Sequence, residues 1–92
     1  MASIDEIHRG KRWVEGAVRQ VAQDLGFRLE MMDWAQSARG FADGTRTLIV
    51  DVGREMRRPF SDEQLAECAA ESPQQDATRA ALRDWLAPRR GA

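Results

Sequence analysis

The chain is poor in the side chains that build metal and redox sites. It contains one cysteine, Cys68, and one histidine, His8, which lie far apart in the sequence. A single cysteine excludes an intramolecular disulfide and is typical of proteins in a reducing, cytoplasmic setting. Because a transition-metal site needs three or four converging His, Cys or carboxylate ligands, we expect no metal site.

Long apolar segments are absent as well. Apolar residues never run longer than three in a row, as in Leu48-Ile49-Val50, whereas a membrane-spanning helix needs roughly 20. The N-terminal residues also lack the apolar segment of a secretory signal. We therefore expect a soluble, cytoplasmic protein that does not enter a membrane.

Neither sign of charge is in excess. The 14 Lys and Arg residues and the 15 Asp and Glu residues leave a net charge of -1 at pH 7, which argues against a surface that is complementary as a whole to nucleic acid or an anionic membrane. The chain is 42% hydrophobic and 32% charged, as globular proteins are. Its 92 residues suit one domain, which we expect over residues 1–88, with a loose tail over residues 89–92.

Hydrophobic periodicity predicts a long N-terminal helix. Ser3 and Glu6 have the spacing of a capping box, and apolar residues then recur every three or four positions as far as Leu25. Gly26 stands where a left-handed C-terminal cap is expected. This helix is therefore predicted to bury one face on the rest of the protein.

Alternating residues predict strands after this helix. Residues 27–31 alternate apolar and polar side chains and predict a strand that reaches about Trp34. Residues 45–52 follow an Asp43-Gly44 turn signal and form the central strand. A third, short strand is predicted to end by Arg58 because Pro59 cannot donate a ladder hydrogen bond. The first two strands are expected to form a long-looped hairpin.

Two further helices are predicted near the C-terminus. Ser61 begins one that reaches about Glu71, and Ser72 caps another, with Pro73 in its first turn and Pro88 at its end. The order of elements is α-β-β-(β)-α-α. It predicts an α+β fold in which helices pack on a small antiparallel sheet.

No residue pattern indicates catalysis. Ser3, Ser61 and Ser72 are explained by helix capping, and Cys68 lies on an apolar helix stripe, where a buried, inert thiol is the usual outcome. The glycines have neither phosphate-loop nor dinucleotide-binding spacing. We therefore expect neither an enzyme nor a bound cofactor.

Apolar residues fall on both faces of the predicted sheet. If the alternation from Phe27 continues, Met32 and Trp34 lie opposite the face of Leu48, and Ile49 lies with them. The C-terminal helices, a protein partner or a second copy would have to cover that face. Met32, Trp34 and Ile49 are thus the candidate partner-binding residues of a protein–protein interaction module, such as an adaptor, regulator or inhibitor.

Arginine supports an alternative function. A cluster follows the central strand, and others lie on the first helix, where they could bind phosphates of a nucleic acid. Acidic neighbours such as Glu55 favour an ordinary solvated edge instead. The residues of this alternative are Arg54, Arg57, Arg58, Arg9 and Arg12.

Overall fold

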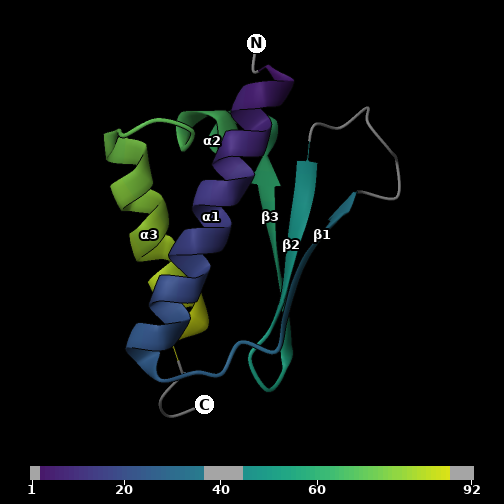
Figure 1. The fold of residues 1–92 in the computed structure, drawn as a ribbon, viewed down its shortest axis with the longest axis vertical. Coiled ribbons are helices and arrows are strands. Elements are labelled where there is room, and N and C mark those ends of the chain that lie inside the picture. Colours follow the sequence, from purple (N-terminus) through teal and green to yellow (C-terminus); the bar gives the residue numbers. More distant parts are fainter. Residues whose placement is uncertain (1–2, 37–44, 88–92) are drawn as a thin grey trace.

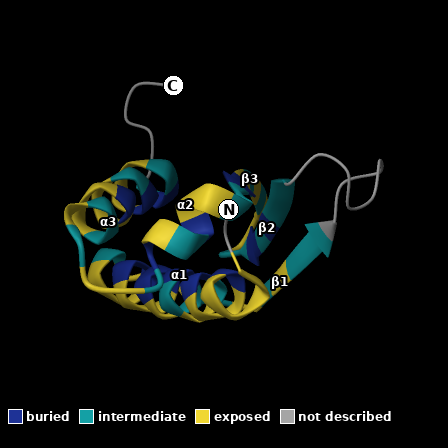
Figure 2. Ribbon diagram, turned by 90° about the horizontal axis from the view of Figure 1, so that it is seen from above, coloured by how far each residue is buried: buried dark blue, intermediate teal, exposed yellow. Residues whose placement is uncertain are grey.

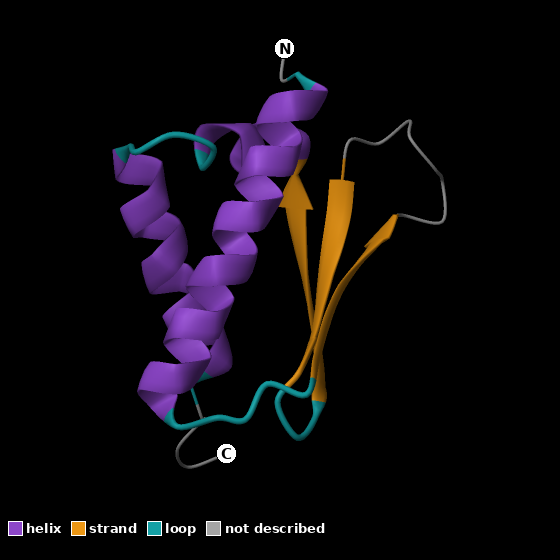
Figure 3. Ribbon diagram, in the orientation of Figure 1, coloured by secondary structure: helices purple, strands orange, loops and turns teal. Residues whose placement is uncertain are grey.

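The predicted fold class is confirmed by the order of elements (Figure 3). The computed structural model describes residues 3–36 and 45–87, in which one helix precedes a three-stranded antiparallel sheet and two further helices. The Asp43-Gly44 turn and the tail over residues 89–92 lie outside these ranges. The elements are α1 (Ile4–Leu25), β1 (Met31–Gln36), β2 (Thr45–Asp51), β3 (Glu55–Ser61), α2 (Asp62–Glu67) and α3 (Pro73–Leu86).

All three helices lie on one side of the sheet (Figure 1), whose strand order is β1-β2-β3. The core fills the space between the two layers, and the buried residues line the inner sides of the helices (Figure 2). No other described helix or strand covers the second sheet face. The largest fully buried side chains are Leu48, Leu65, Leu82, Leu86, Val14, Val18, Val21, Val50 and Cys68.

Helix α1 begins and ends where its sequence predicts. Ser3 and Glu6 form the complete capping box, and Gly26 ends the helix with a left-handed backbone, φ 78°. Gly10 has a role that the sequence does not reveal, because a Cβ atom there would overlap the backbone carbonyl of Leu65. This glycine therefore lets α1 and α2 approach each other closely.

Strand β1 starts later than predicted, and its alternation changes phase. Met31 is in register with Asp51, and Glu30 also donates its N–H to the Asp51 carbonyl over 2.8 Å. Glu30 and Met31 thus both lie opposite Asp51, as in a β-bulge. From Met31 onward, each β1 side chain therefore points to the face opposite to the one predicted from the alternation. The predicted orientation of Met32 and Trp34 is therefore wrong, since they pair with Val50 and Leu48 on the helix side.

Strand β3 is longer than predicted and continues through Pro59 to Ser61. The prediction that this strand ends by Arg58 is wrong. It did not allow for the position of β3 at the edge of the sheet, where proline is tolerated. Every second N–H of an edge strand points away from its neighbour, so proline can be accommodated without loss of a ladder bond. Met56, Arg58 and Phe60 face the helices.

The C-terminal helices match their predicted starts. Ser61 forms the expected capping box, but α2 ends at Glu67, before the predicted Glu71. Ser72 precedes α3 without capping it through its side chain, and its Oγ instead donates to the Glu67 carbonyl over 3.1 Å. The residues between α2 and α3 are thus held by local hydrogen bonds. No helix in residues 3–36 and 45–87 is long and apolar enough to span a membrane.

Candidate functional site

The sheet face that points away from the helices is the candidate interaction surface, called the open face below (Figure 3). Residues directly opposite one another in an antiparallel sheet share a face, so the registers define three rows that cross all three strands on this face. Ile49 is half-buried at the centre of the middle row, and Met31 is 41% exposed. The rows are Ala35–Thr47–Pro59, Asp33–Ile49–Arg57 and Met31–Asp51–Glu55.

Charged side chains lie beside Ile49 in its own row and in the row of Asp51, whereas the row of Thr47 is uncharged. Arg57 Nε lies 3.5 Å from Glu55 Oε2, and both side chains are more than half exposed. Asp33 Oδ1 accepts the N–H of Trp34 over 2.8 Å, and Asp51 Oδ1 accepts that of Gly53 over 3.0 Å. Ile49 is therefore the apolar side chain at the centre of this surface, and charges of both signs lie in two of its three rows.

The register separates the three candidate partner-binding residues. Only Ile49 lies on the open face, whereas Met32 and Trp34 pack partly buried against the core. The Trp34 ring lies 5.8 Å from that of Phe60, and its Nε1 donates to Glu15 Oε2 over 3.2 Å. Trp34 is therefore held by contacts within the chain.

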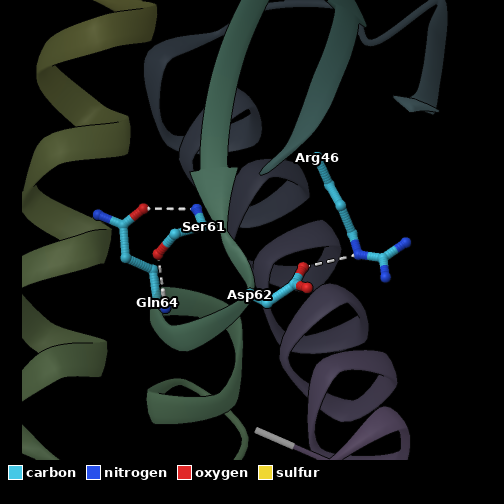
Figure 4. A network of polar contacts seen from close by, with 4 residues as sticks. All are labelled: Arg46, Ser61, Asp62 and Gln64. Carbon is cyan, nitrogen blue, oxygen red and sulfur yellow. Dashed lines mark hydrogen bonds and ion pairs between the residues drawn. The ribbon is translucent and has the colours of Figure 1, made fainter. Parts of the chain in front are cut away.

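A polar network at the start of α2 joins this helix to the sheet (Figure 4). Arg46 Nε donates to Asp62 Oδ1 over 2.9 Å, which ties β2 to the first turn of α2. Lys11 Nζ lies 5.4 Å from the centre of the Trp34 ring. Burial, and secondarily the nearby charge of Arg46, lower the pKa of Lys11. Lys11 of α1 thus packs on an aromatic ring.

The predicted arginine patch is divided among different surfaces. Arg57 lies on the open face, whereas Arg58 faces the helices, with its guanidinium 5.7 Å from the Phe60 ring. Arg54 is exposed between β2 and β3, and Arg9 and Arg12 are exposed on α1. These five residues therefore do not form one phosphate-binding surface.

Arg12 instead belongs to a shallow hollow between α1 and α3. The hollow measures about 320 Å³, and its lining includes Trp13 and Arg79, whose guanidinium lies 5.4 Å from the Trp13 ring. The sequence carries no signal for this contact because the two residues lie on separate helices. A second hollow of about 310 Å³ adjoins it at Arg12 and includes His8 and Arg9.

Metal-ligating side chains and the thiol of Cys68 are the remaining reactive groups of the described residues. No group of three or more His, Cys, Asp or Glu residues within 3–36 and 45–87 could hold a metal ion. Cys68 is 1% exposed, and burial raises the pKa of its thiol, which donates to Thr78 Oγ1 over 3.4 Å. A neutral, buried thiol is a poor nucleophile.

In comparisons with known proteins, the chain matches no family model, no curated protein and no solved structure. Support for a function therefore comes from the residues of the chain itself.

Proposed function

We propose that the protein is a non-enzymatic protein–protein interaction module that binds through its open face. The observation that carries this proposal is the packing of all three helices on one side of the sheet, which leaves Ile49 and Met31 on the other. A polar rim around an apolar centre is the common arrangement of a protein interface. The single, buried cysteine supports a cytoplasmic setting, where thiols stay reduced.

The proposal also uses the chemistry of the rim. Asp33 and Arg57 flank Ile49 on neighbouring strands, so a partner with charges of opposite sign would be oriented as well as bound. Complementary charges of this kind contribute to specificity and to the rate of association. The open face is thus suited to a folded protein surface.

The proposal is tested by replacing the central apolar residue. Ile49→Lys places a charge at the middle of the open face and is expected to abolish binding of an identified, purified partner or of a second copy. Ile4→Lys is the matched control because Ile4 is 69% exposed on α1, away from the sheet. Isothermal titration would measure binding of the partner, and sedimentation would measure binding of a second copy. Circular dichroism would verify that each variant folds.

Two results would contradict this function. One is binding of the partner that is equally strong in the Ile49→Lys and wild-type proteins. The other is loss of binding in both Ile49→Lys and Ile4→Lys, which would place the interface elsewhere.

A second candidate function, binding of nucleic acid, is favoured by the hollow between α1 and α3. Arg12, Arg79 and the Trp13 ring lie together there, and a base can stack on an aromatic ring while arginines contact phosphates. Binding of single-stranded DNA should weaken steeply with salt. Arg12→Gln should reduce it, whereas Arg57→Gln on the open face should not; equal effects of the two would argue against this site.

A further inference from the structure

We propose that the open face binds a second copy of this chain about a two-fold axis that runs parallel to β2. This inference rests on the proposed function and names its partner. It is carried by the middle row of the open face, in which an acidic, an apolar and a basic residue follow one another across the sheet as Asp33, Ile49 and Arg57.

Two simple two-fold arrangements bring the faces of two such sheets together. With the axis across the strands, β1 lies over β1, and Asp33 of one copy meets Asp33 of the other. With the axis along β2, β1 lies over β3, and Asp33 meets Arg57 twice. The second arrangement pairs opposite charges, whereas the first pairs like charges, which costs free energy. Ile49 packs on Ile49 at the axis in both arrangements, so only the charges distinguish them.

Of the two rows beside the middle row, one makes a favourable contact about this axis and the other an unfavourable one. Ala35 of one copy lies over Pro59 of the other, which is an apolar contact. At the opposite end, the two Asp51 side chains approach each other near the axis. Aligned sheets cross at about 30°, so a pivot at Ile49 moves these ends apart, but the repulsion between the Asp51 carboxylates still limits affinity.

The geometry favours face-to-face over edge-to-edge association. Asp33 Oδ1 occupies the N–H of Trp34 on β1, and Pro59 has no N–H to offer on β3. β1 and β3 are both edge strands, so each edge carries a feature that discourages strand addition. The second oxygen of Asp33 remains for Arg57 of the other copy. Arg57 Nε already lies 3.5 Å from Glu55 Oε2 of its own chain, so the contact with Asp33 uses the other guanidinium nitrogens.

The size of the open face sets the strength of this dimer. Three strands of about seven residues cover roughly 340 Å² per copy. Stable complexes bury about 1,200 Å² or more over both partners together. The dimer is therefore weak and reversible, and it dissociates on dilution and at high salt, because its orienting contacts are exposed charge pairs.

Charge reversal tests this arrangement. Sedimentation of concentrated protein at low salt is expected to show wild-type dimers and a roughly tenfold or larger loss of association for Asp33→Arg and for Arg57→Asp, since each variant opposes like charges twice. An equimolar mixture of the two variants should associate again. In the mixed dimer, the introduced arginine meets the introduced aspartate at one contact, and the native Asp33 and Arg57 meet at the other. The double variant should also dimerise with itself.

Several outcomes would overturn the proposal. Dimerisation that is unaffected by either reversal would exclude these contacts, and recovery on mixing Asp33→Arg with wild type alone would indicate the axis across the strands. A wild-type monomer at every concentration would exclude the second copy. If a reversed variant does not fold, Asp33→Asn and Arg57→Gln repeat the comparison with a smaller expected loss.

The same measurements separate this inference from the proposed function. An identified partner that binds wild type but not Ile49→Lys, with no self-association, would refute the second copy and leave the interaction module standing. Absence of both kinds of binding would refute the two together.

Discussion

At the scale of single residues, the two glycines inside α1 have opposite surroundings. Gly10 is buried against the backbone of Leu65, whereas a Cβ atom at Gly16 would meet no other atom within 4 Å. Both glycines weaken a helix by roughly 1 kcal/mol relative to alanine. Only Gly10 offsets that cost, because it permits the close approach of α1 and α2.

Alanine at these two positions should have opposite effects. Gly10→Ala is expected to lower the free energy of unfolding by about 1–3 kcal/mol, since the new methyl group pushes α2 away from α1. Gly16→Ala should raise it by up to about 1 kcal/mol. Urea unfolding followed by circular dichroism measures both, and a stabilised Gly10→Ala variant would contradict the close approach.

Cys68 should be protected in the native state. Its thiol is 1% exposed and burial raises its pKa, so a thiol reagent such as Ellman's reagent is expected to react with it only after unfolding. The measurement is the rate of thiol release with and without denaturant. Rapid reaction of the native protein would show that the helices open readily around α2.

The raised pKa of Cys68 also predicts a pH dependence. The unfolded thiol ionises near its ordinary pKa of 9.0, below the native value. The native thiol therefore keeps its proton up to a higher pH, and the stability that the buried, neutral thiol contributes is lost as the pH rises above about 9. Lys11, whose pKa is lowered, acts in the opposite direction. Cys68→Ala retains Lys11, so the stability difference between wild type and this variant should shrink at alkaline pH; a constant difference would contradict the assignment.

At the scale of elements, the β-bulge at Glu30 decides which side of β1 faces the core. Alternation read from Phe27 assigns Met31 to the core, but the register places Met32 there and leaves Met31 41% exposed. A shift of one residue exchanges every side chain between the two faces of a strand. The bulge therefore determines the composition of the open face.

Substitution of the two adjacent methionines distinguishes the two phases. Met32→Gln puts an amide against the core and is expected to destabilise the protein by about 1–3 kcal/mol. Met31→Gln, on the open face, should change stability by no more than about 0.5 kcal/mol. Thermal unfolding of both variants gives the comparison. A larger loss of stability for Met31→Gln than for Met32→Gln would show that the alternation from Phe27 continues without a bulge.

At the scale of the whole molecule, the described helices all lie on one side of the sheet, and no described helix or strand lies on the other side. Antiparallel sheets tolerate one solvated face, and the charged rows around Ile49 are compatible with water as well as with a second copy. The opposed Asp51 carboxylates are the unfavourable contact of the proposed dimer. Their removal should therefore strengthen association.

Asp51→Asn tests this expectation. An asparagine oxygen can still accept the Gly53 N–H, so the turn between β2 and β3 should persist. The dimer dissociation constant, measured by sedimentation, should fall severalfold because two like charges near the axis are removed. An unchanged or larger constant would contradict the proposed axis.

Local sequence is sufficient for the helix starts and for the central strand. Capping by Ser3 and Ser61, the left-handed Gly26 and the run at residues 45–51 depend on neighbours only a few positions away. The same holds for the fold class, which follows from the order of these elements. Such features can be predicted because their energetics are local.

Long-range packing is required for the features that bear on function. The bulge at Glu30 and the contact of Arg79 with Trp13 each depend on residues distant in sequence. Three helices on one side of the sheet likewise follow from how the apolar stripes fit together, not from any one stripe. The sequence thus specifies that Ile49 lies on a strand, while the packing of the helices decides that its side chain lies on the sheet face away from them.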